Sequence, residues 1–120
     1  MNKNIFITGG TSGIGKSLIY KFAKNNYNIF FTYFNNLSEA KSISKDLNKL
    51  NVHHHYVKMD LSRIKSINNA FKKFTKKFKK LNIFINNASP VPQRKNFLKL
   101  KNADIMKNMA GLLIGNIVSL

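Results

Sequence analysis

Short runs of β-branched and aromatic residues alternate along the chain with longer stretches in which apolar residues recur every three or four positions. The first pattern predicts buried strands and the second predicts amphipathic helices. The predicted strands cover residues 4–8, 28–33, 55–59 and 81–86, and the predicted helices cover residues 13–25, 37–50, 63–81 and 102–120. This alternation is typical of α/β proteins, in which right-handed crossovers give a doubly wound parallel sheet, here with strand order 3-2-1-4.

The third predicted helix has the clearest pattern. Its apolar residues form one stripe, which consists of Ile64, Ile67, Phe71, Phe74, Phe78 and Leu81. Lysines occupy the positions between them, namely Lys72, Lys73, Lys76, Lys77, Lys79 and Lys80. Because no aromatic stacking face accompanies them, these lysines are expected to form the solvated side of the helix and not a nucleic-acid groove.

A sheet of this order usually has more than four strands, so the chain is expected to be a partial domain that ends within or after the fourth helix. The fourth strand would then present an apolar parallel edge to solvent. On this reasoning the chain alone is expected to be only marginally stable. The irregular stretch over residues 88–101, which contains Pro90 and Pro92, is long for a connection and is a candidate functional loop.

The composition narrows the classes of function. The 120 residues include no cysteine, which excludes disulfides and agrees with a cytoplasmic location. No stretch is long and apolar enough to predict a membrane span. The net charge of +17 would ordinarily point to nucleic acid, but Asn, Ile and Phe are abundant together with Lys. Such a combination is typical of a general compositional bias, so we expect neither nucleic acid nor a membrane as a partner.

Three consecutive histidines, His53, His54 and His55, precede or begin the third predicted strand. Consecutive strand residues point alternately to opposite faces, so the three imidazoles cannot converge on one ion. With no cysteine or carboxylate cluster to complete a ligand set, we expect surface histidines and no metal.

A glycine-rich turn, Thr8-Gly9-Gly10-Thr11-Ser12-Gly13-Ile14-Gly15, joins the first predicted strand to the first predicted helix. A strand before and a helix after are the context that a dinucleotide-binding loop requires. Gly9 is expected to let the chain turn off the strand, Gly13 to admit a pyrophosphate, and Gly15 to let the helix pack against the sheet. The helix N-terminus and the hydroxyls of Thr11 and Ser12 would bind the phosphates. A purely structural turn can use the same residues.

Further motifs follow in the same order as the predicted elements. Asp60-Leu61 follows the third strand, Asn86-Asn87-Ala88 ends the fourth, and Met-Ala-Gly-Leu follows Asn108. Together with Thr-Gly-x-x-x-Gly-Ile-Gly they resemble the signature of the short-chain dehydrogenase/reductase family, which implies a Rossmann-like fold and an NAD(P)-dependent oxidoreductase. The resemblance gives Asn108 a supporting catalytic role and assigns cofactor binding to Gly9, Gly10, Thr11, Ser12, Gly13, Ile14, Gly15, Asp60, Leu61, Asn87 and Ala88. Asn86 is expected instead to link neighbouring strands.

The sequence departs from the family pattern in two respects. Ser89 stands where the family usually has glycine. The family's catalytic Ser and its Tyr-x-x-x-Lys pair would follow Leu120, and Tyr20 with Lys24 has that spacing only on the first predicted helix, far from the expected nicotinamide. The chain is therefore predicted to be a fragment without dehydrogenase activity of its own.

The residues after the second predicted strand bear on the choice of cofactor. An acidic residue there would accept the ribose hydroxyls of NAD and repel a 2′-phosphate. The positions from Tyr33 to Asn36 contain no acid, and the next carboxylate is Glu39. With Lys16 nearby, NADP(H) is favoured over NAD(H), although the usual arginine is missing.

For the parent enzyme, the resemblance implies a small-molecule carbonyl or alcohol substrate, with a 3-oxoacyl thioester as one candidate, and a homo-oligomer. Two alternatives stay open. The first is a fragment that binds nucleotide without catalysing a reaction. The second, with less support, is a basic nucleic-acid-associated protein.

Overall fold

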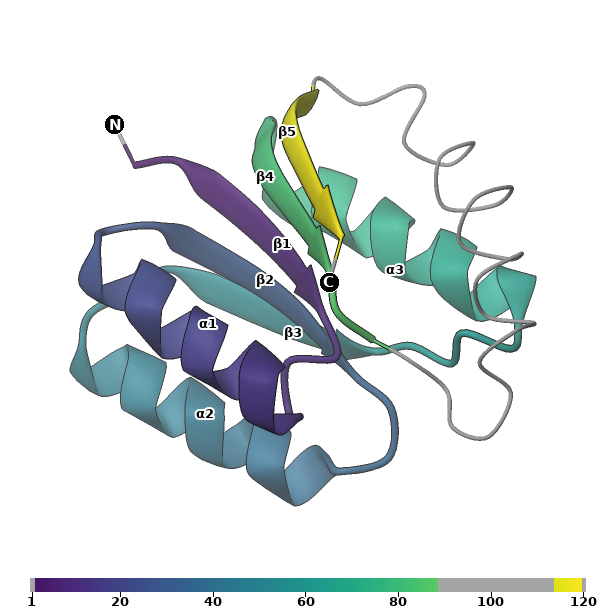
Figure 1. Cartoon of the computed structure of the whole chain (residues 1–120), viewed down its shortest axis with the longest axis horizontal. Helices are drawn as coiled ribbons and strands as arrows, with labels where there is room; N and C mark the ends of the chain where they lie inside the picture. Colours follow the sequence, from purple (N-terminus) through teal and green to yellow (C-terminus); the bar gives the residue numbers. More distant parts are fainter. Residues whose placement is uncertain (1, 89–113, 120) are drawn as a thin grey trace.

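The computed structural model describes residues 2–88 and 114–119, which form a five-stranded parallel sheet with three helices packed on it (Figure 1). The strands are β1 (Asn4–Thr8), β2 (Asn28–Tyr33), β3 (His54–Lys58), β4 (Leu81–Asn86) and β5 (Ile114–Ser119), and the helices are α1 (Gly13–Lys24), α2 (Leu37–Lys49) and α3 (Ile64–Lys77). The sheet order β3-β2-β1-β4-β5 contains the predicted order 3-2-1-4. The prediction of a doubly wound, Rossmann-like α/β fold is confirmed.

The helices cover both faces of the sheet. Helices α1 and α2 lie side by side on one face, and α3 lies on the other (Figure 1). Because side chains alternate along a strand, Ile5 and Ile7 of β1 pack with α1 and α2, whereas Phe6 between them packs with α3. Phe6 is at the centre of an aromatic cluster, since four ring centroids lie 4.8 to 5.3 Å from its own, those of Phe30, Phe71, Phe74 and Phe84.

The strand register places three strand ends together. In the parallel pairs, Ile7 of β1 lies opposite Phe31 of β2, and Thr8 lies opposite Asn86 at the end of β4. The turns that follow β1, β2 and β4 therefore leave the same carboxyl edge of the sheet. This is the edge at which open α/β proteins bind their ligands.

Helix α3 ends earlier than predicted, while α1 and α2 agree with prediction to within a residue. The prediction extended the helix to Leu81, but Phe78 has extended backbone angles, φ −128° and ψ 138°, and ends it. The Phe78 side chain is still buried against Phe74, so the apolar stripe continues past the helix. Ile64 at the other end is 50% exposed, and burial begins at Ile67.

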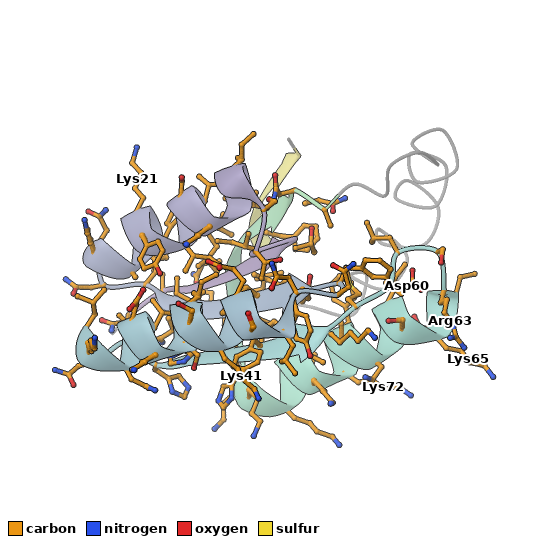
Figure 2. The ribbon with its side chains drawn as sticks, turned by 90° about the horizontal axis from the view of Figure 1, so that it is seen from below. Lys21, Lys41, Asp60, Arg63, Lys65 and Lys72 are labelled. Atoms are coloured by element: carbon orange, nitrogen blue, oxygen red, sulfur yellow. The ribbon has the colours of Figure 1, made fainter. Side chains whose placement is uncertain are left out.

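The polar side of α3 agrees with prediction. The lysines are exposed, namely Lys72, Lys73, Lys76, Lys77, Lys79 and Lys80. Figure 2 shows Lys65 and Lys72 pointing away from the sheet. None of the described helices combines the length and apolarity that a membrane crossing requires.

The predicted fourth helix is wrong where the structure can test it. Residues 114–119 form β5, which pairs in parallel with β4 from Leu81 opposite Ile114 to Asn86 opposite Ser119. The segment Ile-Gly-Asn-Ile-Val-Ser combines a glycine with β-branched residues, which favour a strand once a partner strand is available. The rest of the predicted helix, residues 102–113, lies outside the described residues, as does the candidate loop from residue 89 onward.

The predicted exposed edge at β4 is wrong for the same reason. β4 lies between β1 and β5, so its main chain is paired on both sides. An argument for marginal stability that rests on an open β4 therefore does not hold.

Candidate functional site at the carboxyl edge of the sheet

The glycine-rich turn leads from β1 into α1 at the carboxyl edge. Gly9 has a φ of +68°, in the left-handed region that favours glycine, and a Cβ at this position would lie 2.8 Å from Ala88 Cα. Ser12 caps α1, because its Oγ accepts a hydrogen bond from Gly15 N at 3.2 Å and donates one to Gly9 O at 2.9 Å. The sharp turn expected of Gly9 is confirmed.

The remaining glycines of the turn face different surroundings. Gly10 is buried, and a Cβ there would meet the side chains packed beneath the turn at 2.7 Å. Gly15 is also buried, and a Cβ would lie 2.2 Å from Gly9 O and 2.7 Å from Asn87 Nδ2. Gly15 thus lets the start of α1 pack closely against the glycine turn and against Asn87, the residue that follows β4. Around Gly13, by contrast, nothing lies within 4 Å of an added Cβ.

The N-terminus of α1 is suited to an anion. Gly13 and Ile14 are its first helical residues, so their N–H groups have no acceptor within the helix. The helix dipole places partial positive charge at the same point. No acidic residue lies in the first turn of α1, and Ser12 and Gly13 are exposed there, with Thr11 half-buried. A phosphate could therefore reach the backbone above Gly13.

Thr8, fully buried at the end of β1, joins the turn to β4. Its Oγ1 donates to Asn86 Oδ1 at 2.9 Å and accepts from the main-chain N–H groups of Asn87 and Ala88, both at 3.0 Å. The expectation that Asn86 links neighbouring strands is confirmed. The hydroxyl also fixes the path of the chain as it leaves β4.

Asn87 contacts the glycine turn directly. Its Nδ2 donates to Gly9 O at 3.0 Å and to Ser12 Oγ at 2.9 Å. These residues are 75 to 78 positions apart in the sequence, and the fold brings them together at the carboxyl edge. The structure thus unites the loop motif with the motif that follows β4.

Asp60 lies in the turn between β3 and α3, close to Arg63 (Figure 2). Its Oδ1 accepts from Ser62 Oγ at 2.7 Å and from Ser62 N at 3.0 Å, while its own N–H donates to Ser66 Oγ at 2.7 Å. The hydrogen bond from the Ser62 hydroxyl lowers the pKa of Asp60 below its ordinary value, so the carboxylate is ionised. These contacts are those of an aspartate that caps a turn, and its cofactor role stays a prediction.

Leu61 differs from its neighbour. Its side chain is buried in the aromatic core beneath α3. A contact between Leu61 and a cofactor would therefore have to come from the main chain.

Large apolar side chains are exposed around the same edge. Ile14 is 63% exposed, Phe34 54%, Leu37 40% and Ile64 50%. Each of them lies in the first two residues of a helix or directly follows β2. Exposed apolar side chains beside free N–H groups are typical of a site for a ligand with both apolar rings and charged groups.

Two residues singled out in the sequence, Ser89 and Asn108, lie outside the described residues. Tyr20 does lie within them, and its OH donates to Asp46 Oδ2 at 2.5 Å between α1 and α2. Burial and this hydrogen bond raise the pKa of Tyr20 to about 12. A tyrosine that exchanges protons near neutral pH needs the opposite shift, so Tyr20 with Lys24 does not replace a catalytic pair.

The three histidines alternate as predicted. His54 Nε2 lies 2.7 Å from Ser44 Oγ of α2, while the rings of His53 and His55 lie 5.2 Å apart near Phe78 beneath α3. Burial, followed by the charge of Lys77, lowers the pKa of His55. Within the described part of the chain no three potential metal ligands come together.

Sequence reasoning missed two features of this edge. One is the set of hydrogen bonds made by the Thr8 hydroxyl. The sequence near Thr8 indicates them only by placing a threonine directly before the glycine turn. The other is an ion pair between Lys16 Nζ and Glu39 Oε1 at 2.5 Å, which joins the first turns of α1 and α2. Lys16, which the sequence places near the cofactor, is therefore paired with a carboxylate 23 positions later, and no local pattern indicates this pairing.

Comparison with known proteins agrees with this geometry. A family model described as short chain dehydrogenase matches residues 3–118. The L-rhamnose 1-dehydrogenase (NADP(+)) of Thermoplasma acidophilum is 34% identical over 90 residues, which are 75% of this chain and 35% of that protein. The 3-oxoacyl-acyl-carrier-protein reductase FabG of Staphylococcus epidermidis is 23% identical over 88 residues, which are 73% of this chain and 36% of that protein.

A solved structure shares the fold. The short-chain dehydrogenase of Burkholderia cenocepacia, solved in complex with NADP, superposes with a TM-score of 0.83 at 21% identity and covers 98% of this chain and 54% of that one. The matched region is about a third of the length of the curated relatives. On the strength of the family match over most of its length, the chain belongs to the short-chain dehydrogenase family.

Proposed function

We propose that the chain is the cofactor-binding part of an NAD(P)-dependent oxidoreductase and that it binds the dinucleotide across the carboxyl edge of the sheet. The observation that carries the proposal is the open space at Gly13, where nothing lies within 4 Å of an added Cβ, at a helix N-terminus capped by Ser12. The surrounding glycines are tightly packed, so this opening is local. A pyrophosphate is the group of a dinucleotide that such a point favours.

The other residues of the edge have roles that fit a dinucleotide. The N–H groups of Gly13 and Ile14, with the hydroxyls of Thr11 and Ser12, would bind the phosphates. Asp60 and the main chain of Leu61 would border the adenine, and Asn87 and Ala88 would border the nicotinamide ribose. When bound, the nicotinamide supplies the carbon that gives or accepts a hydride.

We favour NADP(H) over NAD(H) as the cofactor. Residues 33–36, at the end of β2 and directly after it, include no carboxylate that would repel a 2′-phosphate. The name of the relative from Thermoplasma acidophilum also specifies NADP.

The activity proposed for the whole protein is hydride transfer between the nicotinamide and a small-molecule carbonyl or alcohol. A 3-oxoacyl thioester is one candidate substrate, supported by the reductase among the relatives. Asn108 would support catalysis from outside the described residues, and we propose a cytoplasmic homo-oligomer. The second candidate is a module that binds the dinucleotide without catalysis, and the raised pKa of Tyr20 removes the Tyr20–Lys24 pair of the described part from a catalytic role.

Titration with NADPH, followed by the fluorescence of its nicotinamide, tests the proposal. We expect saturable binding to the unmodified chain and a loss of affinity of about a hundredfold or more in Gly13→Asp, which puts a carboxylate against the pyrophosphate. Ser42→Asp is the matched control, since it adds the same charge at an exposed position of α2. Equal affinity of Gly13→Asp and Ser42→Asp for NADPH would remove the glycine turn from the site.

A further inference from the structure

Among the acidic residues of the described part, Glu39 alone contacts a cationic side chain. Asp46 accepts a hydrogen bond from Tyr20, and Asp60 accepts two from Ser62. Glu39 instead contacts a cation, since its Oε1 lies 2.5 Å from Lys16 Nζ. That oxygen is shielded from solvent. In a chain with 21 Lys and Arg against 4 Asp and Glu, this carboxylate neutralises one particular lysine.

The ion pair lies at the carboxyl edge. Lys16 directly follows Gly15 in the first turn of α1. Glu39 is in the first turn of α2, where Asn36 Oδ1 caps the helix by accepting from Glu39 N at 3.1 Å. Both helices begin at this edge (Figure 1). The pair therefore joins the first turns of the two helices that follow the glycine turn and the end of β2.

The end of β2, near which the ion pair lies, borders the adenine ribose in dinucleotide-binding α/β folds. The group that distinguishes the two cofactors, a 2′-hydroxyl or a 2′-phosphate, lies beyond the end of β2. A free ammonium there favours the phosphate, and a free carboxylate disfavours it. In this chain the ammonium and the carboxylate are paired with each other, so neither acts with its full charge.

We propose that Glu39 is a specificity-determining residue, which restrains the preference for NADP(H) by pairing with Lys16. This inference rests on the proposed function, because it requires a dinucleotide at the carboxyl edge. Without the Glu39 carboxylate, Lys16 would be free to pair with a 2′-phosphate. Without Lys16, the carboxylate would repel that phosphate.

A purely structural role for the pair is a weaker explanation. The side chains of Lys16 and Glu39 are 42% and 28% exposed, and partly exposed ion pairs contribute little to stability. The hydrogen bond from Tyr20 to Asp46 also joins α1 to α2, so the helices stay connected without Glu39.

Affinities of the full chain for NADPH and NADH, measured in parallel by fluorescence titration, test the inference. We expect Glu39→Gln to raise the ratio of NADPH affinity to NADH affinity by about tenfold, and Lys16→Gln to lower it by about tenfold. The double variant should return to within about threefold of the original ratio, because the two charges are removed together. NADH affinity should change little throughout.

Asp46→Asn is the matched control, since it removes the same charge from the other end of α2. A ratio unchanged in Glu39→Gln and Lys16→Gln would overturn the inference, and so would an equal increase in Asp46→Asn, which would indicate a net-charge effect. If thermal melting shows that Glu39→Gln does not fold, Lys16→Gln decides alone. Failure of the unmodified chain to bind either nucleotide would refute the proposed function instead, and the inference with it.

Discussion

Alanine at Gly15 should destabilise the protein far more than alanine at Gly13, although both residues lie in the first turn of α1. A Cβ at Gly15 would lie 2.2 Å from Gly9 O, and real Cβ atoms are essentially never closer than 3.0 Å to such an atom. The carbonyl belongs to a tightly constrained turn at positive φ, so it cannot move without disturbing its hydrogen bonds. At Gly13 the added methyl group would enter open space.

The structure sets the size of the difference. Overpacking of this kind costs about 1 to 3 kcal/mol. Gly9 O also accepts hydrogen bonds from Asn87 Nδ2 and Ser12 Oγ, and each contributes about 1 kcal/mol. We therefore expect Gly15→Ala to lower the free energy of unfolding by about 3 kcal/mol, equivalent to a fall in Tm of roughly 10 to 15 °C. Gly13→Ala should be neutral or stabilising by up to about 1 kcal/mol, since alanine is the better helix former.

Thermal unfolding followed by circular dichroism at 222 nm would measure both variants against the unmodified chain. The comparison is internal, because both variants add one methyl group to the same helix turn. Equal melting temperatures for the two alanine variants would refute the packing assigned to Gly15, and a larger loss at Gly13 would refute the open space assigned to the phosphate.

Three further predictions follow from the same contacts. Thr8→Val should lower the free energy of unfolding, measured in urea, by about 2 to 3 kcal/mol, because the N–H groups of Asn87 and Ala88 lose their acceptor. Thr8→Ser keeps the hydroxyl and should cost less than about 1 kcal/mol. Equal losses in the two variants would contradict this role of the hydroxyl. Tyr20 should deprotonate near pH 12 in an ultraviolet titration of the folded chain and at lower pH in Asp46→Asn. Because the pKa of Tyr20 is raised from 10.0, its contribution to stability should be fully present below pH 10 and lost as pH rises towards 12; a value unchanged in Asp46→Asn would show that the hydrogen bond has no part in the shift. Because the pKa of Tyr20 is raised, this tyrosine should not support oxidation of NADPH by carbonyl substrates; turnover that is abolished by Tyr20→Phe would contradict this.

Local patterns were sufficient to predict most of the fold. Hydrophobic periodicity predicted the first four strands and three helices. Each of these elements buries apolar residues that recur at the spacing of a strand or a helix, so the pattern is visible in the sequence. It failed at β5, where residues 114–119 pair with β4 more than thirty residues earlier. A short apolar segment forms helix or strand according to its partner, and the partner is not visible locally.

Motifs predicted the residues of the candidate site but not the contacts between them. The turn from Gly9 to Gly15 could be identified because a strand, its glycines and a helix follow one another. The Thr8 hydrogen bonds and the pairing of Lys16 with Glu39 join segments far apart in the sequence. Such contacts depend on strand register and helix packing, so the sequence does not indicate that Lys16 is paired with Glu39.

The most direct test of the central claim is a map of the bound dinucleotide on the chain. Amide chemical shifts of the ¹⁵N-labelled protein would be recorded by NMR during titration with NADP⁺. We predict that the largest changes fall on the turn from Gly9 to Gly15 and on Asn87, with smaller changes at Asp60. The absence of changes, or changes centred on the hollow lined by Lys3, Asn26 and Tyr27, would contradict a dinucleotide site at the carboxyl edge of the sheet.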